Sequence, residues 1–235
     1  MVFTYSKLRK YSVCQRAFYH YYLLQESPKE HEAQVFGKKF HTAIDKLNEA
    51  NENLFEPEII KMVKALRANP DFQQFEIKEF EKKVFRKVWE VDKKKFYDFF
   101  GIYDALAVHK ETGENWILEW KSSDREWTYT DRAGKYHKEK LNDNLLQHSI
   151  YKDIYVDKDL EQKCNFGYFI ITKHATPRVQ FISSAKNELE FMSRNKITDI
   201  CDAIMNDFEF FPTCFKQDQS KCFLCDCREV CSAWF

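Results

Sequence analysis

The stretch that decides the fold runs from Gly101 to Lys121 and reads GIYDALAVHKETGENWILEWK. Its two apolar runs, around Asp104 and around Glu119, are separated by the turn-forming residues KETGEN, a pattern typical of a β-hairpin. Glu119 and Lys121 are two residues apart on the second strand, so they project from the same face. Asp104 on the first strand can reach that face across the hairpin. The stretch therefore predicts two carboxylates and a lysine side by side.

Two carboxylates beside a lysine suit the hydrolysis of a phosphodiester bond. Carboxylate oxygens hold Mg²⁺ or Mn²⁺, and such an ion keeps water ligands that can serve as nucleophiles. A neighbouring ammonium group can orient the attacking water and offset charge on the phosphate. An E-x-K triplet also arises by chance on solvated strand faces when 31% of the residues are charged. The surrounding sequence therefore decides between a functional and a structural interpretation.

The residues on either side of the hairpin predict further helices and strands. Helices are expected at 5–24, 32–50 and 58–67, strands at 74–90, 95–109 and 116–121, a helix at 141–156, a strand at 166–172 and a helix at 185–207. The continuous apolar run FGYFIIT at 166–172 is typical of a buried strand. This order predicts an α/β fold in a single domain over residues 1–235, with a helical part at 1–73, a core at 74–173 and a C-terminal part at 174–235.

Composition limits the classes of protein that the chain can belong to. It has 235 residues, 44% of them hydrophobic, which is enough for a core. No run approaches the roughly 18 apolar residues that span a membrane, and the N-terminal MVFTYSKLRK lacks the apolar segment of a secretory signal. These features predict a cytoplasmic protein without membrane contact. Basic and acidic residues number 37 each, so any binding of nucleic acid depends on local basic patches.

Two helical motifs flank the hairpin. Gly37-Lys-Lys-Phe-His41 places an imidazole on the second predicted helix, and Gln147 and Tyr151 are four residues apart and share a helical face. A histidine in such a helix is also compatible with a purely structural role. The ordered set G-x-x-x-H, G-I-x-D, E-x-K and Q-x-x-x-Y, over residues 37–172, resembles the PD-(D/E)XK superfamily, specifically its RecB-type exonuclease branch.

The resemblance implies a restriction-endonuclease-like fold, with a mixed central sheet in an αβββαβ core flanked by N- and C-terminal helices. It also implies a site for Mg²⁺ or Mn²⁺, whose ligands would be His41, Asp104, Glu119 and the backbone carbonyl of Trp120. Lys121 would be the catalytic lysine, and Gln147 and Tyr151 would position the DNA or the polar groups of the site. Glu119 departs from this branch, which more usually has Asp there.

The eight cysteines are distributed unevenly along the chain. Without a secretory signal they are better interpreted as metal or cofactor ligands than as disulfides. The motif Cys222-x2-Cys225-x5-Cys231 supplies three thiolates, and Cys14 is a candidate for a fourth. The spacing fits Zn²⁺ and an iron–sulfur cluster equally well.

Four other cysteines complete the set. Cys214 or Cys227 could replace one of the ligands just named, because both lie in the same C-terminal segment. Cys164 and Cys201 stand alone in the sequence. A free thiol behaves as a small apolar group, so these two are expected to be buried in the core.

The arrangement of the cysteines is similar to the iron–sulfur branch of the RecB-type nucleases, which includes AddB-type helicase–nuclease subunits and CRISPR-adaptation nucleases. In that branch one cysteine lies near the N-terminus in a C-x-R-x-F-Y context, and C-x2-C-x5-C lies at the other end. The resemblance implies one [4Fe-4S] cluster, which Cys14, Cys222, Cys225 and Cys231 would hold and which would close the fold by joining the two chain ends. Zn²⁺ in the same four-cysteine site stays the alternative.

Candidate contacts for DNA lie in three basic segments, at 38–39, 93–95 and 135–140. The polar segment 122–140 is long for a connection, and its Trp127, Tyr129 and Tyr136 are candidates for stacking on bases of a single strand. A solvated surface would show the same charges.

These features together lead to the expectation of a metal-dependent DNA exonuclease. It would act on single-stranded DNA or duplex ends in recombination, repair or phage DNA metabolism, with a protein partner in a recombination or repair complex. A catalytically inactive DNA-binding or assembly subunit of the same fold is the alternative. A zinc-stapled interaction protein with accidental nuclease-like motifs is a third hypothesis.

Overall fold

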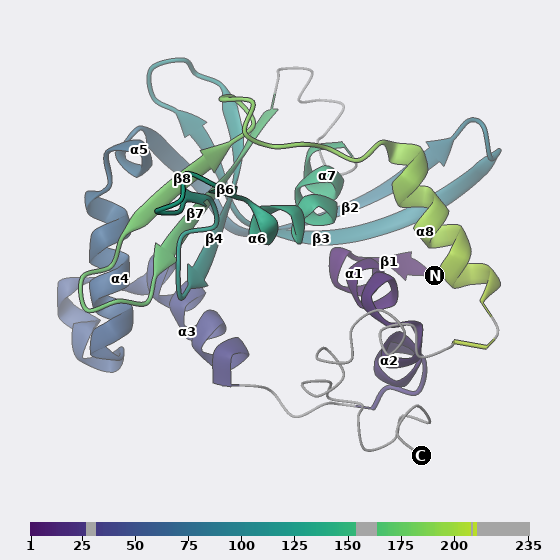
Figure 1. The fold of residues 1–235 in the computed structure, drawn as a ribbon, viewed down its shortest axis with the longest axis horizontal. Coiled ribbons are helices and arrows are strands. Elements are labelled where there is room, and N and C mark those ends of the chain that lie inside the picture. The colour runs from purple at the N-terminus through teal and green to yellow at the C-terminus, as the bar shows by residue number, and fades with distance from the viewer. Residues whose placement is uncertain (27–31, 154–163, 208, 211–235) are drawn as a thin grey trace. The chain divides into compact units, whose positions relative to one another are not determined.

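The computed structural model describes residues 1–26, 32–153, 164–207 and 209–210 (Figure 1). The chain divides into two compact units, each assembled from separate segments. The larger unit takes residues 31–84 and 101–192, and the smaller unit takes 1–30, 85–100 and 193–235. The predicted catalytic residues all belong to the larger unit. The single domain predicted over 1–235 stays a prediction.

A mixed sheet organises the larger unit. Its strands are β2 (Phe75–Glu90), β3 (Lys95–His109), β4 (Asn115–Ser123), β7 (Cys164–Thr172) and β8 (Val179–Ser183). β2 continues into the smaller unit and β3 arrives from it. β2 pairs with β3, β3 pairs antiparallel with β4, β4 pairs parallel with β7, and β7 pairs antiparallel with β8. A parallel pair needs a crossover connection, and the segment between β4 and β7 supplies one.

Helices surround this sheet in the larger unit. They are α3 (Glu32–Lys46), a 3₁₀ helix (Glu49–Leu54), α4 (Pro57–Ala68), α5 (Pro70–Gln73), α6 (Glu139–Asn142) and α7 (Leu145–Asp153). Proline occupies the first turn of both α4 and α5, where its missing N–H has no partner to lose. Strands β5 (Tyr129–Thr130) and β6 (Tyr136–His137) form a separate two-stranded ribbon before α6.

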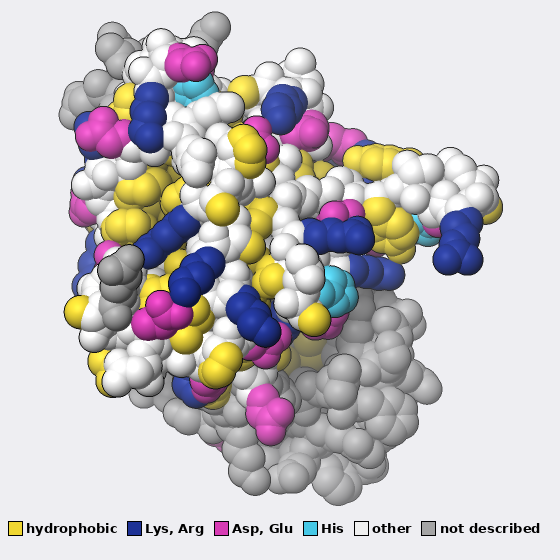
Figure 2. Space-filling model, turned by 90° about the vertical axis from the view of Figure 1, so that its left-hand side faces the viewer, with side chains coloured by type: hydrophobic (Ala, Val, Ile, Leu, Met, Phe, Trp, Pro, Cys, Tyr) yellow, Lys and Arg dark blue, Asp and Glu magenta, His cyan; other side chains and the backbone are white. Residues whose placement is uncertain are grey.

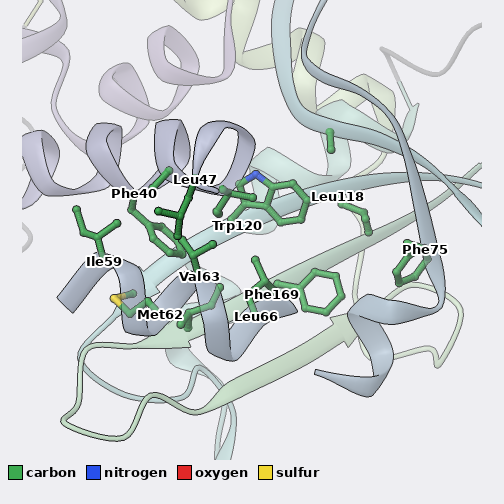
Figure 3. Packing of buried hydrophobic residues seen from close by; sticks show 14 of the residues in the cluster. Phe40, Leu47, Ile59, Met62, Val63, Leu66, Phe75, Leu118, Trp120 and Phe169 are labelled. Atoms are coloured by element: carbon green, nitrogen blue, oxygen red, sulfur yellow. The ribbon is translucent and has the colours of Figure 1, made fainter. Parts of the chain in front are cut away.

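The main core lies between helices α3 and α4 and one face of the sheet (Figure 3). The helices contribute Phe40, Ile59, Met62, Val63 and Leu66, the connection after α3 contributes Leu47, and the strands contribute Phe75, Leu118, Trp120 and Phe169. Burial of each large apolar side chain stabilises the fold by about 1.5–3 kcal/mol. Phe40 is fully buried, so this packing fixes α3 and with it the next residue, His41.

Helix α7 covers the opposite face of the sheet. Phe166 and Tyr168 of β7 lie on the face of the strand opposite to the core residue Phe169. The ring of Phe166 contacts Tyr151 of α7 at a centroid distance of 6.1 Å, and the ring of Tyr168 contacts His148 of α7 at 5.9 Å. The His148 Nε2 donates to the carbonyl of Glu190 at 2.6 Å, and burial lowers the pKa of His148 to about 4. The imidazole is therefore neutral at physiological pH.

The smaller unit combines both ends of the described chain. Strand β1 (Val2–Phe3) pairs parallel with β3, and α1 (Tyr5–Val13), α2 (Gln15–Phe18), a π-helical turn (Tyr19–Leu23) and α8 (Arg194–Asn206) complete it. Asp202 of α8 accepts hydrogen bonds from Tyr97 at 2.8 Å and from Lys95 at 3.1 Å. No helix in the described ranges is long and apolar enough to cross a membrane.

The α/β fold and its αβββαβ order are confirmed, and several details differ from the sequence prediction. The helix expected at 32–50 ends at Lys46, and the helix expected from 141 is divided into α6 and α7. The helix expected at 5–24 breaks at Cys14, whose φ of −158° is extended. The last helix, expected from 185, begins at Arg194, and residues 179–183 form the unexpected strand β8. The buried positions of Cys164 and Cys201 are as predicted.

We expect Gly167→Ala to destabilise the protein by about 1–3 kcal/mol, the usual cost of overpacking. A Cβ at Gly167 would lie 2.6 Å from Cε2 of Phe181. That ring is stacked on Phe169 at 4.5 Å and cannot move away freely. Denaturant unfolding measures the effect. Gly37→Ala is the matched control, because nothing lies within 4 Å of its Cβ and alanine favours helix; a Gly167→Ala protein as stable as Gly37→Ala would contradict the prediction.

Candidate active site

Adjacent strands β3 and β4 bring the two predicted carboxylates together. The backbone N–H of Trp120 donates to Oδ2 of Asp104 at 2.8 Å, and the backbone N–H of Asp104 donates to Oε1 of Glu119 at 3.3 Å. Each carboxylate is thus held by the backbone of the other strand. The hairpin geometry predicted from the sequence is confirmed.

His41 reaches this pair from α3. Its Nδ1 lies 3.1 Å from Oδ1 of Asp104. Burial opposes protonation of the imidazole, but attraction to Asp104 outweighs burial, so the pKa of His41 is raised. Burial likewise acts to raise the pKa of Asp104, but His41, Lys121 and the N–H of Trp120 lower it below its usual value. Asp104 is therefore a carboxylate.

Glu119 lies at the centre of the site and is only 1% exposed. Its Oε2 accepts hydrogen bonds from Nζ of Lys121 at 3.0 Å and from Nε2 of Gln147 at 2.8 Å. Burial, together with repulsion from Asp104, raises the pKa of Glu119 to about 7, although Lys121 opposes the shift. The raised pKa means that burial in this site disfavours the charged form of Glu119.

Gln147 and Tyr151 share one face of α7, as their spacing predicts, but their side chains donate hydrogen bonds to different partners. Gln147 donates directly to Glu119, whereas the hydroxyl of Tyr151 donates to the backbone carbonyl of Ile102 at 3.1 Å. The Tyr151 ring also packs edge-on against Tyr103 at 5.4 Å. Tyr151 thus ties α7 to strand β3, next to Asp104.

The ligand types at this site suit a divalent cation, since carboxylate oxygens and imidazole nitrogens bind Mg²⁺ or Mn²⁺. Among the described residues, however, no three His, Cys, Asp or Glu side chains form a group that could hold a metal ion. Glu119 is directed toward Lys121 and Gln147, whereas Asp104 is directed toward His41. The donor set fits a cation that would offset the buried negative charge, and the ligand roles of His41, Asp104, Glu119 and the Trp120 carbonyl stay predictions.

At least half of the eight lysines predicted to contact DNA form ion pairs with acidic side chains, and Lys95 with Asp202 is one of these pairs. Lys39 pairs with Glu56, Lys93 with Asp199, and Lys138 with Glu190. Figure 2 likewise shows basic side chains dispersed among acidic and hydrophobic ones on the face that it presents. Lys140 differs, because its Nζ donates to Oγ of Ser123 at 2.9 Å. Ser123 is two residues after Lys121 on the same strand face.

The three aromatic residues predicted to stack on bases have different environments. Trp127 is buried and packs on Tyr168 at 5.1 Å, so it belongs to the core and the prediction is wrong for it. Tyr129 stacks on His137 at 4.8 Å, and Tyr136 is exposed.

The predicted cluster ligands are only in part described. Cys14 is buried at the break between α1 and α2. Cys222, Cys225 and Cys231, and also Cys214 and Cys227, lie outside the described residues.

Comparisons with known proteins bear on the fold and the family of the chain. No curated protein matches the chain. The solved structure of SSO0001 is similar at 15% identity and a TM-score of 0.55, over 100% of this chain and 87% of that one. A structure named "Putative exonuclease" from Eubacterium rectale is similar at 12% identity and a TM-score of 0.56, over 97% of this chain and 87% of that one. At these identities the likeness shows the fold alone.

The family model described as PD-(D/E)XK nuclease superfamily matches residues 2–232, nearly the whole chain. The match includes the strands that bear Asp104, Glu119 and Lys121. The chain therefore belongs to the PD-(D/E)XK nuclease superfamily.

Proposed function

We propose that this nuclease is a Mg²⁺- or Mn²⁺-dependent DNA exonuclease, with Lys121 as the catalytic lysine. The observation that carries the proposal is the row of hydrogen bonds around the buried Glu119, in which Asp104, Lys121 and Gln147 take part. Burying two carboxylates so close together costs stability, and such costs are typical of functional sites. His41, Asp104, Glu119 and the Trp120 carbonyl would hold the metal ion.

The roles of the side chains follow from their positions. A metal ion held by this set would supply an acidified water and positive charge for the phosphate. The ammonium of Lys121, held 3.0 Å from Glu119, orients the attacking water and offsets charge on the phosphate. Gln147 keeps Glu119 in place, and His41 does the same for Asp104. The oxygen of the water forms a bond to phosphorus while the bond between phosphorus and the leaving sugar oxygen breaks. The leaving oxygen takes up a proton that the water has lost.

The proposal is tested with linear and circular single-stranded DNA of one sequence, each with Mg²⁺, with Mn²⁺ and with EDTA. We expect the metal ions to support degradation of the linear DNA only, and EDTA to abolish it, because an exonuclease needs an end. Gel analysis of end-labelled DNA measures this. Cleavage of circular DNA would replace the exonuclease proposal with an endonuclease, and intact linear DNA with both metals would favour the inactive-subunit alternative.

We also propose that the chain belongs to the RecB-type branch and carries a [4Fe-4S] cluster on Cys14, Cys222, Cys225 and Cys231. The buried position of Cys14 supports this, because a cluster ligand is shielded from solvent. The supporting sequence feature is the C-x2-C-x5-C motif.

The cluster proposal predicts a brown protein after anaerobic purification, with absorbance near ~400 nm and about four irons per chain. Absorption spectroscopy with iron, sulfide and zinc assays measures it, and Cys14→Ala is expected to lower the iron content. Cys201→Ala is the matched control, since Cys201 is a buried thiol outside the proposed ligand set. A colourless protein with one zinc per chain would replace the cluster with a zinc site.

The substrate and setting of this activity are part of the proposal. Single-stranded DNA or duplex ends are the proposed substrates, and recombination, repair or phage DNA metabolism in the cytoplasm is the proposed setting, with a partner protein in that complex. The motif order that resembles the RecB-type branch supports these points.

A further inference from the structure

A cavity of about 450 Å³ lies at the end of the sheet strand that carries Glu119 and Lys121. Its lining residues come from the segment after β4, from the end of β7 and from the turn between β7 and β8, and they are Arg125, Glu126, Tyr129, Thr130, Thr172, His174 and Arg178. This volume is within the range of small-ligand sites. Two arginines and a histidine line it together with a single acid, so the lining favours an anion.

The cavity lies close to the candidate active site along the sheet. Thr172, which lines the cavity, is the register partner of Ser123 on parallel strands, about 4.8 Å away. Ser123 in turn follows Lys121 by two residues, or about 7 Å along the strand. Lys140, which donates a hydrogen bond to Ser123, adds a positive charge between the candidate active site and the cavity. A strand of nucleic acid cut beside Lys121 would therefore reach the cavity within one or two nucleotides.

Both walls of the cavity are attached to the sheet. On one side, Oε1 of Gln180 accepts hydrogen bonds from the backbone N–H groups of Trp127 and Thr128, at 2.9 and 3.3 Å. On the other side, the backbone N–H of Arg178 donates to Oγ1 of Thr172 at 2.9 Å, and its carbonyl accepts from the N–H of Thr172 at 3.0 Å. The backbone of Arg178 is therefore held directly, and Arg125 lies two residues before the backbone held at Trp127, which lowers the entropy lost on binding.

The cationic groups are oriented but not neutralised. Nη1 of Arg125 donates to the hydroxyl of Tyr129 at 3.1 Å, and its guanidinium lies 5.5 Å from the centre of that ring. Within the described part of the chain, neither Arg125 nor Arg178 forms an ion pair, in contrast to Lys39, Lys93 and Lys138. Guanidinium groups bind phosphate oxygens in a bidentate manner.

We infer that this cavity binds the phosphate backbone of the substrate strand next to the phosphate that is cut, through Arg125 and Arg178. The inference rests on the proposed function for the identity of the strand. Tyr129 is a positioning residue, because it holds the Arg125 guanidinium. Glu126 opposes binding and limits its strength.

The test is the affinity of the full-length protein for a fluorescein-labelled single-stranded DNA 15-mer, measured by anisotropy in EDTA so that no cleavage occurs. We expect Arg125→Gln with Arg178→Gln to weaken binding about 10-fold, and the slope of log affinity against log salt to fall by about 1.4, since each phosphate contact on a single strand contributes about 0.7. Glu126→Gln is expected to strengthen binding, and Tyr129→Phe to weaken it slightly.

Lys46→Gln with Lys61→Gln is the matched control, because it removes two charges from the helices α3 and α4. It is expected to change the affinity less than twofold. Equal affinities of the arginine variant and this control would overturn the inference, whereas the cleavage assay of the wild-type protein would still decide the proposed function. Loss of affinity in the arginine variant, with a wild-type protein that cleaves no DNA, would support the cavity and overturn the nuclease proposal.

Discussion

Lys121→Ala is expected to lower the rate constant of DNA cleavage by about 10³-fold, or about 4 kcal/mol in the activation barrier. The reason is the position of its ammonium group, 3.0 Å from Oε2 of Glu119 and 23% exposed. It is thus a positive side chain that contacts a buried carboxylate and is also accessible to solvent. DNA affinity is expected to change little, because many other basic side chains contribute to it.

Single-turnover cleavage of end-labelled DNA, with enzyme in excess, measures the chemical step of Lys121→Ala apart from binding. Lys138→Ala is the matched control, since Lys138 is a nearby lysine in the sequence whose ammonium is paired with Glu190. Lys121→Arg adds a test of geometry, because a guanidinium keeps the charge but not the shape of an ammonium. A Lys121→Ala protein within threefold of the wild-type rate would contradict the catalytic role.

Glu119→Gln is expected to abolish cleavage and Mn²⁺ binding while it stabilises the fold. The raised pKa of Glu119 shows that the folded state disfavours its charge, because the carboxylate is buried and repelled by Asp104. Above the folded pKa of about 7, a raised pKa means that ionisation costs stability, so a neutral amide relieves that cost. Stability and activity are then expected to change in opposite directions, as at other functional sites.

The hydrogen bonds of the site support this choice of substitution. A glutamine with its oxygen in the place of Oε2 still accepts from Lys121 and Gln147. Its amide nitrogen cannot accept, so the variant loses the 3.3 Å hydrogen bond from the backbone N–H of Asp104, the longest of the three, and the charge of the ion pair with Lys121. The variant therefore removes the charge with the least change in packing.

Calorimetric Mn²⁺ titration, single-turnover cleavage and thermal unfolding at pH 8 measure the three effects of Glu119→Gln. Glu111→Gln, in the exposed turn between β3 and β4, is the control and should leave all three unchanged. Unchanged Mn²⁺ affinity would remove Glu119 from the ligand set, and a lower melting temperature would show that the carboxylate stabilises the fold.

The sequence alone determined the fold class and the strand bearing the site. Alternation along a strand places Glu119 and Lys121 on one face whatever the rest of the chain does, and the turn KETGEN brings Asp104 beside them. Helical spacing likewise put Gln147 and Tyr151 on one face of α7. These are local rules of backbone geometry, so they can be applied without the tertiary structure.

Local rules also failed where long-range contacts compete with them. Apolar periodicity over 5–24 predicts one helix, but the backbone is extended at Cys14. Strand β8 is short and has a weak sequence signal, and it forms because it pairs with β7 along the edge of the sheet. Trp127 looks available for stacking in the sequence, yet it is buried against Tyr168.

Only the tertiary structure decided which basic side chains meet acidic partners and where the proposed phosphate-binding cavity lies. Lys39, Lys93 and Lys138 look like DNA contacts in the sequence, but each meets an acid from another element. Arg125 and Arg178 are far apart in the sequence and meet in one cavity only because β4 and β7 are parallel neighbours. The spacing of residues along a chain does not encode such meetings, because they depend on which strands pair across the sheet.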